Sequence, residues 1–213
     1  MAQWWSVPAT VVSIVLGLAL LINLVMPSPE LASPTTEHNP DYVRLPYGTH
    51  PGAPVTLVEF VDLQCPFCSS THPTIARLRE EFGDDLNYVL KHAPNGDIHP
   101  QALLAAVAAH CAHGQAARDD FVTNAFEHQA DLSYPVLRDI AQGLSLDLKA
   151  FDECMRSDES KQAIESDLME AARVDIRGTP TIFINGARLE GLQQEAHLYQ
   201  LIEAIIDGSQ TTQ

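Results

Sequence analysis

Apolar residues gather in one long run near the N-terminus and in shorter, periodic groups along the rest of the chain. Residues 7–26 contain no charged side chain. A helix of that length spans roughly 30 Å at about 1.5 Å per residue, which matches the hydrocarbon thickness of a bilayer. Residues 27–54 are rich in Pro, Ser, Thr and Gly, which favours an extended tether. The pattern predicts a membrane anchor over residues 1–26, a tether over residues 27–54, and a folded domain after it.

A cleaved signal peptide is the alternative interpretation of the apolar run. Such a peptide would have a basic n-region, a shorter apolar core and a cleavage site of small residues. No Lys or Arg precedes Arg44, and residues 28–32 (SPELA) are a poor cleavage site. We therefore expect one uncleaved span through residues 7–26, with Trp4 and Trp5 at the membrane interface.

The first part of the folded domain has the pattern of a strand, a helix and a second strand. Residues 55–61 (VTLVEFV) are an apolar, β-branched run, which is typical of a strand buried on both faces. Pro66 suits the first turn of a helix that should end at Gly83. Residues 86–91 then predict a second strand. This order indicates a βαβ unit with a right-handed crossover.

Helical signals dominate the middle of the chain. Apolar periodicity and helix propensity are high over residues 101–111, 121–129, 135–142, 150–156 and 160–174. The Ala-rich first segment is too weakly apolar for a second membrane span, so we expect soluble helices. Together they predict a helical insertion over residues 93–173.

Strand signals return near the end of the chain. The predicted elements are a strand over residues 180–184, a hairpin turn at Asn185-Gly186, a return strand over residues 187–190 and an amphipathic helix over residues 194–206. The predicted fold class is α/β. In this interpretation, residues 55–92 and 174–207 form one domain that the helical insertion interrupts.

Composition narrows the classes of function. The net charge of −16 and the pI near 4.7 exclude a nucleic-acid-binding protein, because phosphate binding requires clustered Lys and Arg. An acidic surface also repels anionic lipid, so attachment to a membrane must be hydrophobic. Four cysteines are too few for a disulfide-scaffolded mini-protein, and their positions therefore matter more than their number.

Cys65 and Cys68 form a C-x-x-C pair, a spacing shared by zinc half-sites and redox pairs. Zinc requires a second pair of ligands with similar spacing, whereas Cys111 and Cys154 stand apart from each other. We therefore expect neither a metal nor an organic cofactor. The pair lies where a buried strand meets a helix N-terminus, and free N–H groups and the helix dipole stabilise a thiolate there. This position assigns attack on substrate to Cys65 and resolution of the mixed disulfide to Cys68.

Two separated motifs resemble the DsbA-like branch of the thioredoxin superfamily. Residues 58–68 (VEFVDLQCPFC) are similar to its active-site segment, and residues 178–186 (GTPTIFING) are similar to its cis-proline loop and following hairpin. The helical insertion resembles that of the family at His99-Pro100, Cys111, Gln115, Phe151 and Cys154. The resemblance implies a thioredoxin-like fold with an inserted helical subdomain, and thiol–disulfide exchange as the activity.

The resemblance also implies roles for individual residues. Pro180 would be the cis-proline that faces the active-site disulfide, and Thr179 would pair with an extended substrate segment. A trans proline that opens an edge strand is the alternative. Glu59 matches the family's buried acid, and burial would raise its pKa and suit it to relay the proton of Cys68. A partly exposed strand carboxylate is the alternative for Glu59.

The remaining cysteines and the residue between the reactive pair complete the comparison with the family. Cys111 and Cys154 are interpreted as a structural disulfide within the insertion, with two buried free thiols or a redox relay as alternatives. The best-known oxidases of the family carry Pro-His between the reactive cysteines, and Phe67 stands at the histidine position here. A histidine cation stabilises a thiolate and Phe67 does not, so the sequence argues less strongly for an oxidising potential.

These observations predict a thiol:disulfide oxidoreductase that forms disulfides in unfolded or secreted proteins. A reductase or isomerase that uses the same site, and a non-catalytic tethered chaperone, are the alternatives. The resemblance implies reoxidation by a quinone-linked membrane thiol oxidase. Lasting disulfides belong to oxidising compartments. We therefore expect a single-pass protein of the cell membrane whose catalytic domain lies on the extracytoplasmic, periplasmic side.

Overall fold

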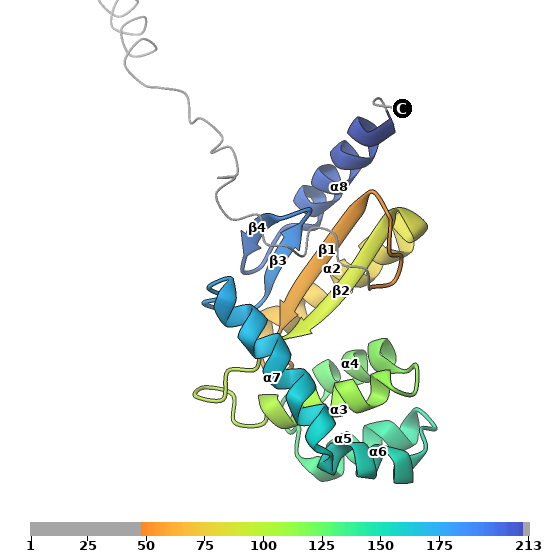
Figure 1. Ribbon diagram of the computed structural model, residues 1–213, viewed down its shortest axis with the longest axis vertical. Helices are drawn as coiled ribbons and strands as arrows, with labels where there is room; N and C mark the ends of the chain where they lie inside the picture. Colours follow the sequence, from red (N-terminus) through yellow and green to blue (C-terminus); the bar gives the residue numbers. More distant parts are fainter. Residues whose placement is uncertain (1–47, 211–213) are drawn as a thin grey trace, which may run out of the picture. The chain divides into compact units, whose positions relative to one another are not determined.

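The computed structural model describes residues 48–210 of the chain (Figure 1). The expected anchor and the expected tether up to residue 47 lie outside this range. Within residues 48–210, no helix combines the length and the apolar character needed to cross a membrane.

A four-stranded sheet with the order β2-β1-β3-β4 forms the centre of the domain (Figure 1). Strand β1 (Val55–Val61) pairs in parallel with β2 (Leu86–His92) and antiparallel with β3 (Thr181–Ile184). Strand β4 (Ala187–Glu190) returns antiparallel to β3. Every residue of β1 and β2 is buried, as their continuous apolar runs predict for strands covered on both faces.

Helix α2 (Pro66–Phe82) and the short 3₁₀ helix η2 (Gly83–Asp85) connect β1 to β2. Pro66 occupies the first turn, where its missing N–H removes no helical hydrogen bond. Gly83 ends the helix with a φ of 45°, a conformation that glycine adopts at low cost. Both ends of α2 therefore lie where the sequence predicts them.

The helical insertion contains five helices. Their bounds are α3 (Ala102–His113), α4 (Arg118–Glu127), α5 (Tyr134–Gly143), α6 (Leu148–Arg156) and α7 (Asp158–Arg173). Helices α3 to α6 form a bundle beyond one end of the sheet, and α7 leads from the bundle back along the sheet (Figure 1). Six buried alanines on α3 let its neighbours approach closely, which explains the Ala-rich segment without a membrane span.

The two faces of the sheet are covered by different helices. Val58 and Phe60 of β1 form a small core with Ala171 and Val174 at the end of α7. Alternate residues of β1, including Leu57 and Val61, belong to the larger core that continues into α2, the insertion and the closing helix α8 (Glu195–Gln210). Glu59 shares the parity of this second set, so β1 directs a carboxyl group toward the larger core.

Candidate active site

Cys65 caps the N-terminus of α2, and Cys68 lies one turn into the helix. Cys65 keeps an extended conformation before Pro66, with a φ of −74° and a ψ of 121°. Its side chain is 5 % exposed, whereas Cys68 is completely buried. Both cysteines are free thiols in the structure. One sulfur is therefore at the surface of the site and the other is behind it.

The surroundings of Cys65 strongly favour its thiolate. The pKa of Cys65 is lowered to about 5, chiefly because the Cys68 thiol donates a hydrogen bond to it. The Thr179 side chain and the backbone N–H groups of Phe67 and Cys68 lower the pKa further, against the effect of burial. These N–H groups belong to the first turn of α2, where no helical carbonyl accepts from them. Cys65 is therefore ionised at neutral pH, as its position at the helix N-terminus predicts.

The surroundings of Cys68 have the opposite effect. Burial raises the pKa of Cys68 well above its ordinary value, and the hydrogen bond to Cys65 raises it further. The charges of Cys65 and Glu59 also disfavour a second anion at this place. Cys68 thus stays protonated until a base removes its proton.

The loop before β3 forms the opposite wall of the site. The peptide bond between Thr179 and Pro180 is cis. The Thr179 carbonyl oxygen lies 3.2 Å from the sulfur of Cys65 and accepts a hydrogen bond from the protonated thiol. The Thr181 hydroxyl donates to the carbonyl of Gly178 at 2.7 Å, which closes the turn. The structure thus brings the two motifs of the sequence together at one place.

Glu59 lies within the core behind the reactive pair. Its side chain is 2 % exposed, and burial raises its pKa to about 7. The Tyr88 hydroxyl donates a hydrogen bond of 2.7 Å to Oε2 of Glu59. Its charge is among the influences that raise the pKa of the Cys68 thiol. A carboxyl group with a pKa near neutrality can both accept and return a proton under physiological conditions.

Two polar residues that the sequence analysis did not single out hold the backbone around Cys65. Buried Asp62 accepts 2.8 Å hydrogen bonds from the backbone of Gln64 and Asn95 and from Nδ1 of His99. Gln129 donates to the carbonyl oxygens of Leu63 and Cys65 at 2.8 and 3.0 Å. Asp62 lies inside the recognised active-site segment and could have been found there. Gln129 follows α4 by two residues, and no sequence pattern marks its contact.

A cavity of about 650 Å³ adjoins Cys65. It lies between the N-terminus of α2, the loop after β2 and the end of α7. Phe67 and Ile98 are largely exposed beside it, at 58 % and 67 %. Leu168, Ala171, Ala172 and Ile176 add to its apolar lining. The cavity offers an apolar surface to a molecule that reaches the thiol.

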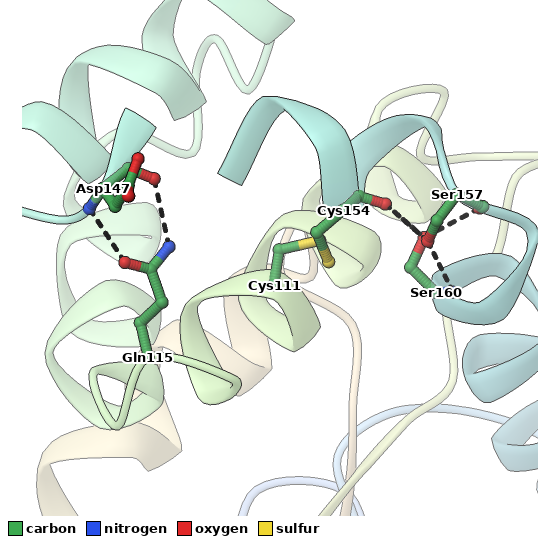
Figure 2. Close-up of a disulfide and its surroundings, with 6 residues drawn as sticks. All are labelled: Cys111, Gln115, Asp147, Cys154, Ser157 and Ser160. Carbon is green, nitrogen blue, oxygen red and sulfur yellow. Dashed lines mark hydrogen bonds between the residues drawn. A yellow bond between two sulfur atoms is a disulfide. The ribbon is translucent and has the colours of Figure 1, made fainter. Parts of the chain in front are cut away.

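The second pair of cysteines forms a disulfide within the insertion, between α3 and α6 (Figure 2). Cys111 and Cys154 have their Cα atoms 5.7 Å apart. On one side of the disulfide, the Gln115 side chain exchanges two hydrogen bonds with the backbone of Asp147 (Figure 2). On the other side, the Ser160 hydroxyl donates to the carbonyl of Cys154 at 2.7 Å (Figure 2). The disulfide is therefore part of the framework of the insertion and is separate from the free thiols of the active site.

A family model described as thioredoxin matches residues 46–204, which include the sheet, the insertion and both site motifs. The chain belongs to the thioredoxin family. Because it belongs to this family and contains two thiols whose pKa values are shifted in opposite directions, the chain is a thioredoxin-type oxidoreductase. The helices between β2 and β3 form the insertion that the sequence resemblance implies.

Solved structures of DsbA-like thioredoxin-family proteins share this fold. α-DsbA1 from Wolbachia pipientis has a TM-score of 0.68 at 22 % identity, over 89 % of this chain and 98 % of that chain. Oxidised BdbD from Bacillus subtilis has a TM-score of 0.66 at 23 % identity, over 75 % of this chain and 91 % of that chain. The resemblance to the DsbA-like branch is thus confirmed at the level of the fold.

Part of several proteins named Na⁺/H⁺ antiporters is also similar in sequence to this chain. Na⁺/H⁺ antiporter NhaA 1 from Mycolicibacterium gilvum is 38 % identical over 156 residues, which are 72 % of this chain and 25 % of the antiporter. An antiporter NhaA from Herminiimonas arsenicoxydans is 32 % identical over 183 residues, which are 86 % of this chain and 28 % of the antiporter. The chain therefore spans about a quarter of the length of these relatives.

Proposed function

We propose that this oxidoreductase catalyses dithiol–disulfide exchange through Cys65 and Cys68, in the direction of disulfide formation. The observation that carries the proposal is the unlike ionisation of the two thiols. A pKa near 5 for Cys65 stabilises the reduced protein relative to its disulfide. Such stabilisation makes a dithiol couple more oxidising. The same low pKa makes Cys65 a good leaving group.

The exchange would proceed in two steps. A substrate thiolate attacks the sulfur of Cys65 in the oxidised protein, which forms a mixed disulfide and breaks the bond to Cys68. The Cys68 sulfur leaves with the electron pair and takes a proton from Glu59. A second substrate thiolate then attacks the substrate sulfur of the mixed disulfide and expels the Cys65 thiolate. The substrate is oxidised by two electrons, and the protein becomes a dithiol.

The substrates would be unfolded or secreted proteins with pairs of cysteines. In this proposal, an extended substrate segment pairs with the backbone at Thr179, next to Pro180, and brings its sulfur to Cys65. The adjoining cavity would accept an apolar residue near the substrate cysteine. An extended chain suits this site because folded proteins present few cysteines with free flanking backbone.

Reduction potential separates this proposal from its alternatives. We expect the Cys65–Cys68 couple to equilibrate with glutathione at a potential between about −180 and −120 mV, as oxidising dithiol proteins do. The variant with both Cys111 and Cys154 replaced by alanine, measured beside the natural chain, assigns the potential to the reactive pair. A value near −270 mV, where thioredoxin lies, would indicate a reductase. Suppression of aggregation without electron transfer to a dithiol peptide would indicate a chaperone.

We also propose that the catalytic domain is held at the extracytoplasmic face of the cell membrane by residues 7–26. There it would meet secreted chains and a quinone-linked thiol oxidase that returns it to the disulfide state. The apolar run supports the anchor, and the similarity to part of proteins named Na⁺/H⁺ antiporters suits a site at a membrane. We expect the full chain to remain in the membrane fraction at high salt, with a C-terminal alkaline phosphatase fusion active. A fusion reporter active in the cytoplasm instead would contradict this orientation.

A further inference from the structure

Tyr88 connects the buried carboxyl of the site to a chain of charged groups at the surface. Its hydroxyl lies 2.7 Å from Oε2 of Glu59, and the Tyr88 side chain is 1 % exposed. The two residues come from neighbouring strands, since Tyr88 of β2 is the register partner of Leu57 in β1. A tyrosine is large enough to reach diagonally across this pair of strands. The hydroxyl therefore meets the carboxyl inside the core, where water does not compete for it.

The ring and the backbone of Tyr88 are fixed from three sides. The Arg79 guanidinium of α2 lies 4.5 Å from the centroid of the ring. Arg79 in turn pairs with Asp119 in the first turn of α4. At the outer edge of β2, the Tyr88 N–H donates to the Thr49 hydroxyl at 2.9 Å. The Thr49 N–H donates to the Tyr88 carbonyl at 3.2 Å. With so many constraints, the hydroxyl is held in one place.

We propose that Tyr88 is a positioning residue for proton transfer between Glu59 and Cys68, and that its hydroxyl holds the ionised carboxyl in place. The inference rests on the proposed function, because it concerns the step in which Cys68 gains or loses a proton. A phenol that donates to a carboxylate offsets part of the cost of burying that charge. Without it, Glu59 would remain a carboxylic acid over a wider range of pH and would be a poorer base.

The charges around Glu59 agree with this role. Burial is the main influence on its pKa, and it is opposed by the Tyr88 hydroxyl and by the Arg79 charge. The other groups that interact electrostatically with the pair are Cys68 and Arg79 from α2 and Arg118 at the start of α4, and Asp119 of α4 pairs with Arg79. Burial and the neighbouring Glu59 raise the pKa of Tyr88 well above its ordinary value. Tyr88 therefore remains a donor throughout the range in which Glu59 titrates.

The test separates capture of a disulfide from its resolution. The reduced full chain is mixed with oxidised glutathione, and the release of the first and second glutathione thiols is followed between about pH 5 and about pH 9, which brackets the Glu59 pKa near 7. In the first step, Cys65 attacks and forms a mixed disulfide. In the second step, Cys68 loses its proton to Glu59 and expels the second thiol.

For Tyr88→Phe, we expect the pH midpoint of the second step to rise by roughly one unit. At pH values below the midpoints of both the variant and the natural chain, the second step should therefore be about tenfold slower in the variant. The first step serves as the internal reference and should keep its rate. Tyr134→Phe is the matched control, because its hydroxyl bonds to Asp152 in the insertion at 2.6 Å. This control should leave both steps unchanged. Glu59→Gln should remove the midpoint from the second step, and adding Tyr88→Phe to it should change nothing further.

Two outcomes would overturn the inference. One is a second step whose pH profile is the same in Tyr88→Phe and in the natural chain. The other is equal slowing by Tyr88→Phe with and without Glu59, which would make Tyr88 structural. If Tyr88→Phe folds poorly, Arg79→Gln replaces it, and we expect a smaller upward shift of the same midpoint. Absence of glutathione capture in the natural chain at every pH would instead contradict the proposed function.

Discussion

Cys65→Ser is expected to abolish disulfide exchange, whereas Cys68→Ser is expected to trap substrates on Cys65. Cys65 has the low pKa that a nucleophile and leaving group needs, and it lines the cavity that adjoins the site. Cys68 is completely buried, so it can meet only a sulfur already bound to Cys65. Without Cys65, no substrate is captured. Without Cys68, the mixed disulfide has no internal thiol to break it.

Mass spectrometry of both variants after incubation with a disulfide-linked peptide dimer measures these results, because the Cys65 thiolate can attack the peptide disulfide and release one peptide as a thiol. We expect a peptide adduct on Cys68→Ser and none on Cys65→Ser, with a loss of exchange activity of at least about 10³-fold in each. Such losses are usual when a covalent nucleophile is removed. Alkylation of the reduced natural chain should show a midpoint near pH 5, because the Cys65 thiolate is lost as the pH falls through its pKa. An adduct on Cys68 in the Cys65→Ser variant would reverse the assigned roles.

The strand–helix–strand unit around the reactive cysteines could be predicted closely because its signals are strong and local. A continuous apolar run, a proline and a glycine mark β1 and both ends of α2, and these ends lie where they were expected. The helices of the insertion were predicted in kind, with ends that differ by a few residues. For example, α4 begins at Arg118, before the predicted start at Phe121. Its first turn contains Asp119, which apolar periodicity does not reveal although the helix dipole favours an acid there.

Some chemical features of the site could also be predicted from a short segment of sequence, and others could not. The low pKa of Cys65 follows from the Cys68 thiol one turn away and from the helix N-terminus. A short segment of sequence reveals both. The contact between Tyr88 and Glu59 joins residues 29 positions apart in the chain. It depends on the register of two strands and on the direction of a long side chain, and Tyr88 is otherwise an ordinary buried aromatic residue of a strand. Contacts of this kind can be identified only from the three-dimensional structure. The same is true of the hydrogen bond that Gln129 donates to the carbonyl oxygen of Cys65.

Removing the disulfide of the insertion should lower stability and leave the chemistry largely intact. Cys111 and Cys154 are 43 residues apart in the chain. For a loop of that length, the loss of the cross-link should lower the free energy of unfolding by roughly 3–4 kcal/mol through the entropy of the unfolded chain. Cys111 of α3 is also buried, so the replacement should be small and apolar. The variant of choice has alanine at both positions, which leaves no unpaired thiol.

Denaturant unfolding of this double variant, with exchange activity measured in parallel, tests the expectation. Gln115→Ala is the matched control, because it breaks the neighbouring link between the turn after α3 and Asp147 but keeps the disulfide. Its expected cost is roughly 1–3 kcal/mol, because two neutral hydrogen bonds are lost and each usually contributes about 0.5–1.5 kcal/mol net. Exchange should persist in both variants because the thiolate at Cys65 is stabilised by the first turn of α2 and by Thr179. A double variant as stable as the natural chain, or one that folds fully but exchanges no disulfide, would show that the bond has another role. The second result would indicate that Cys111 and Cys154 take part in electron transfer, as a redox relay.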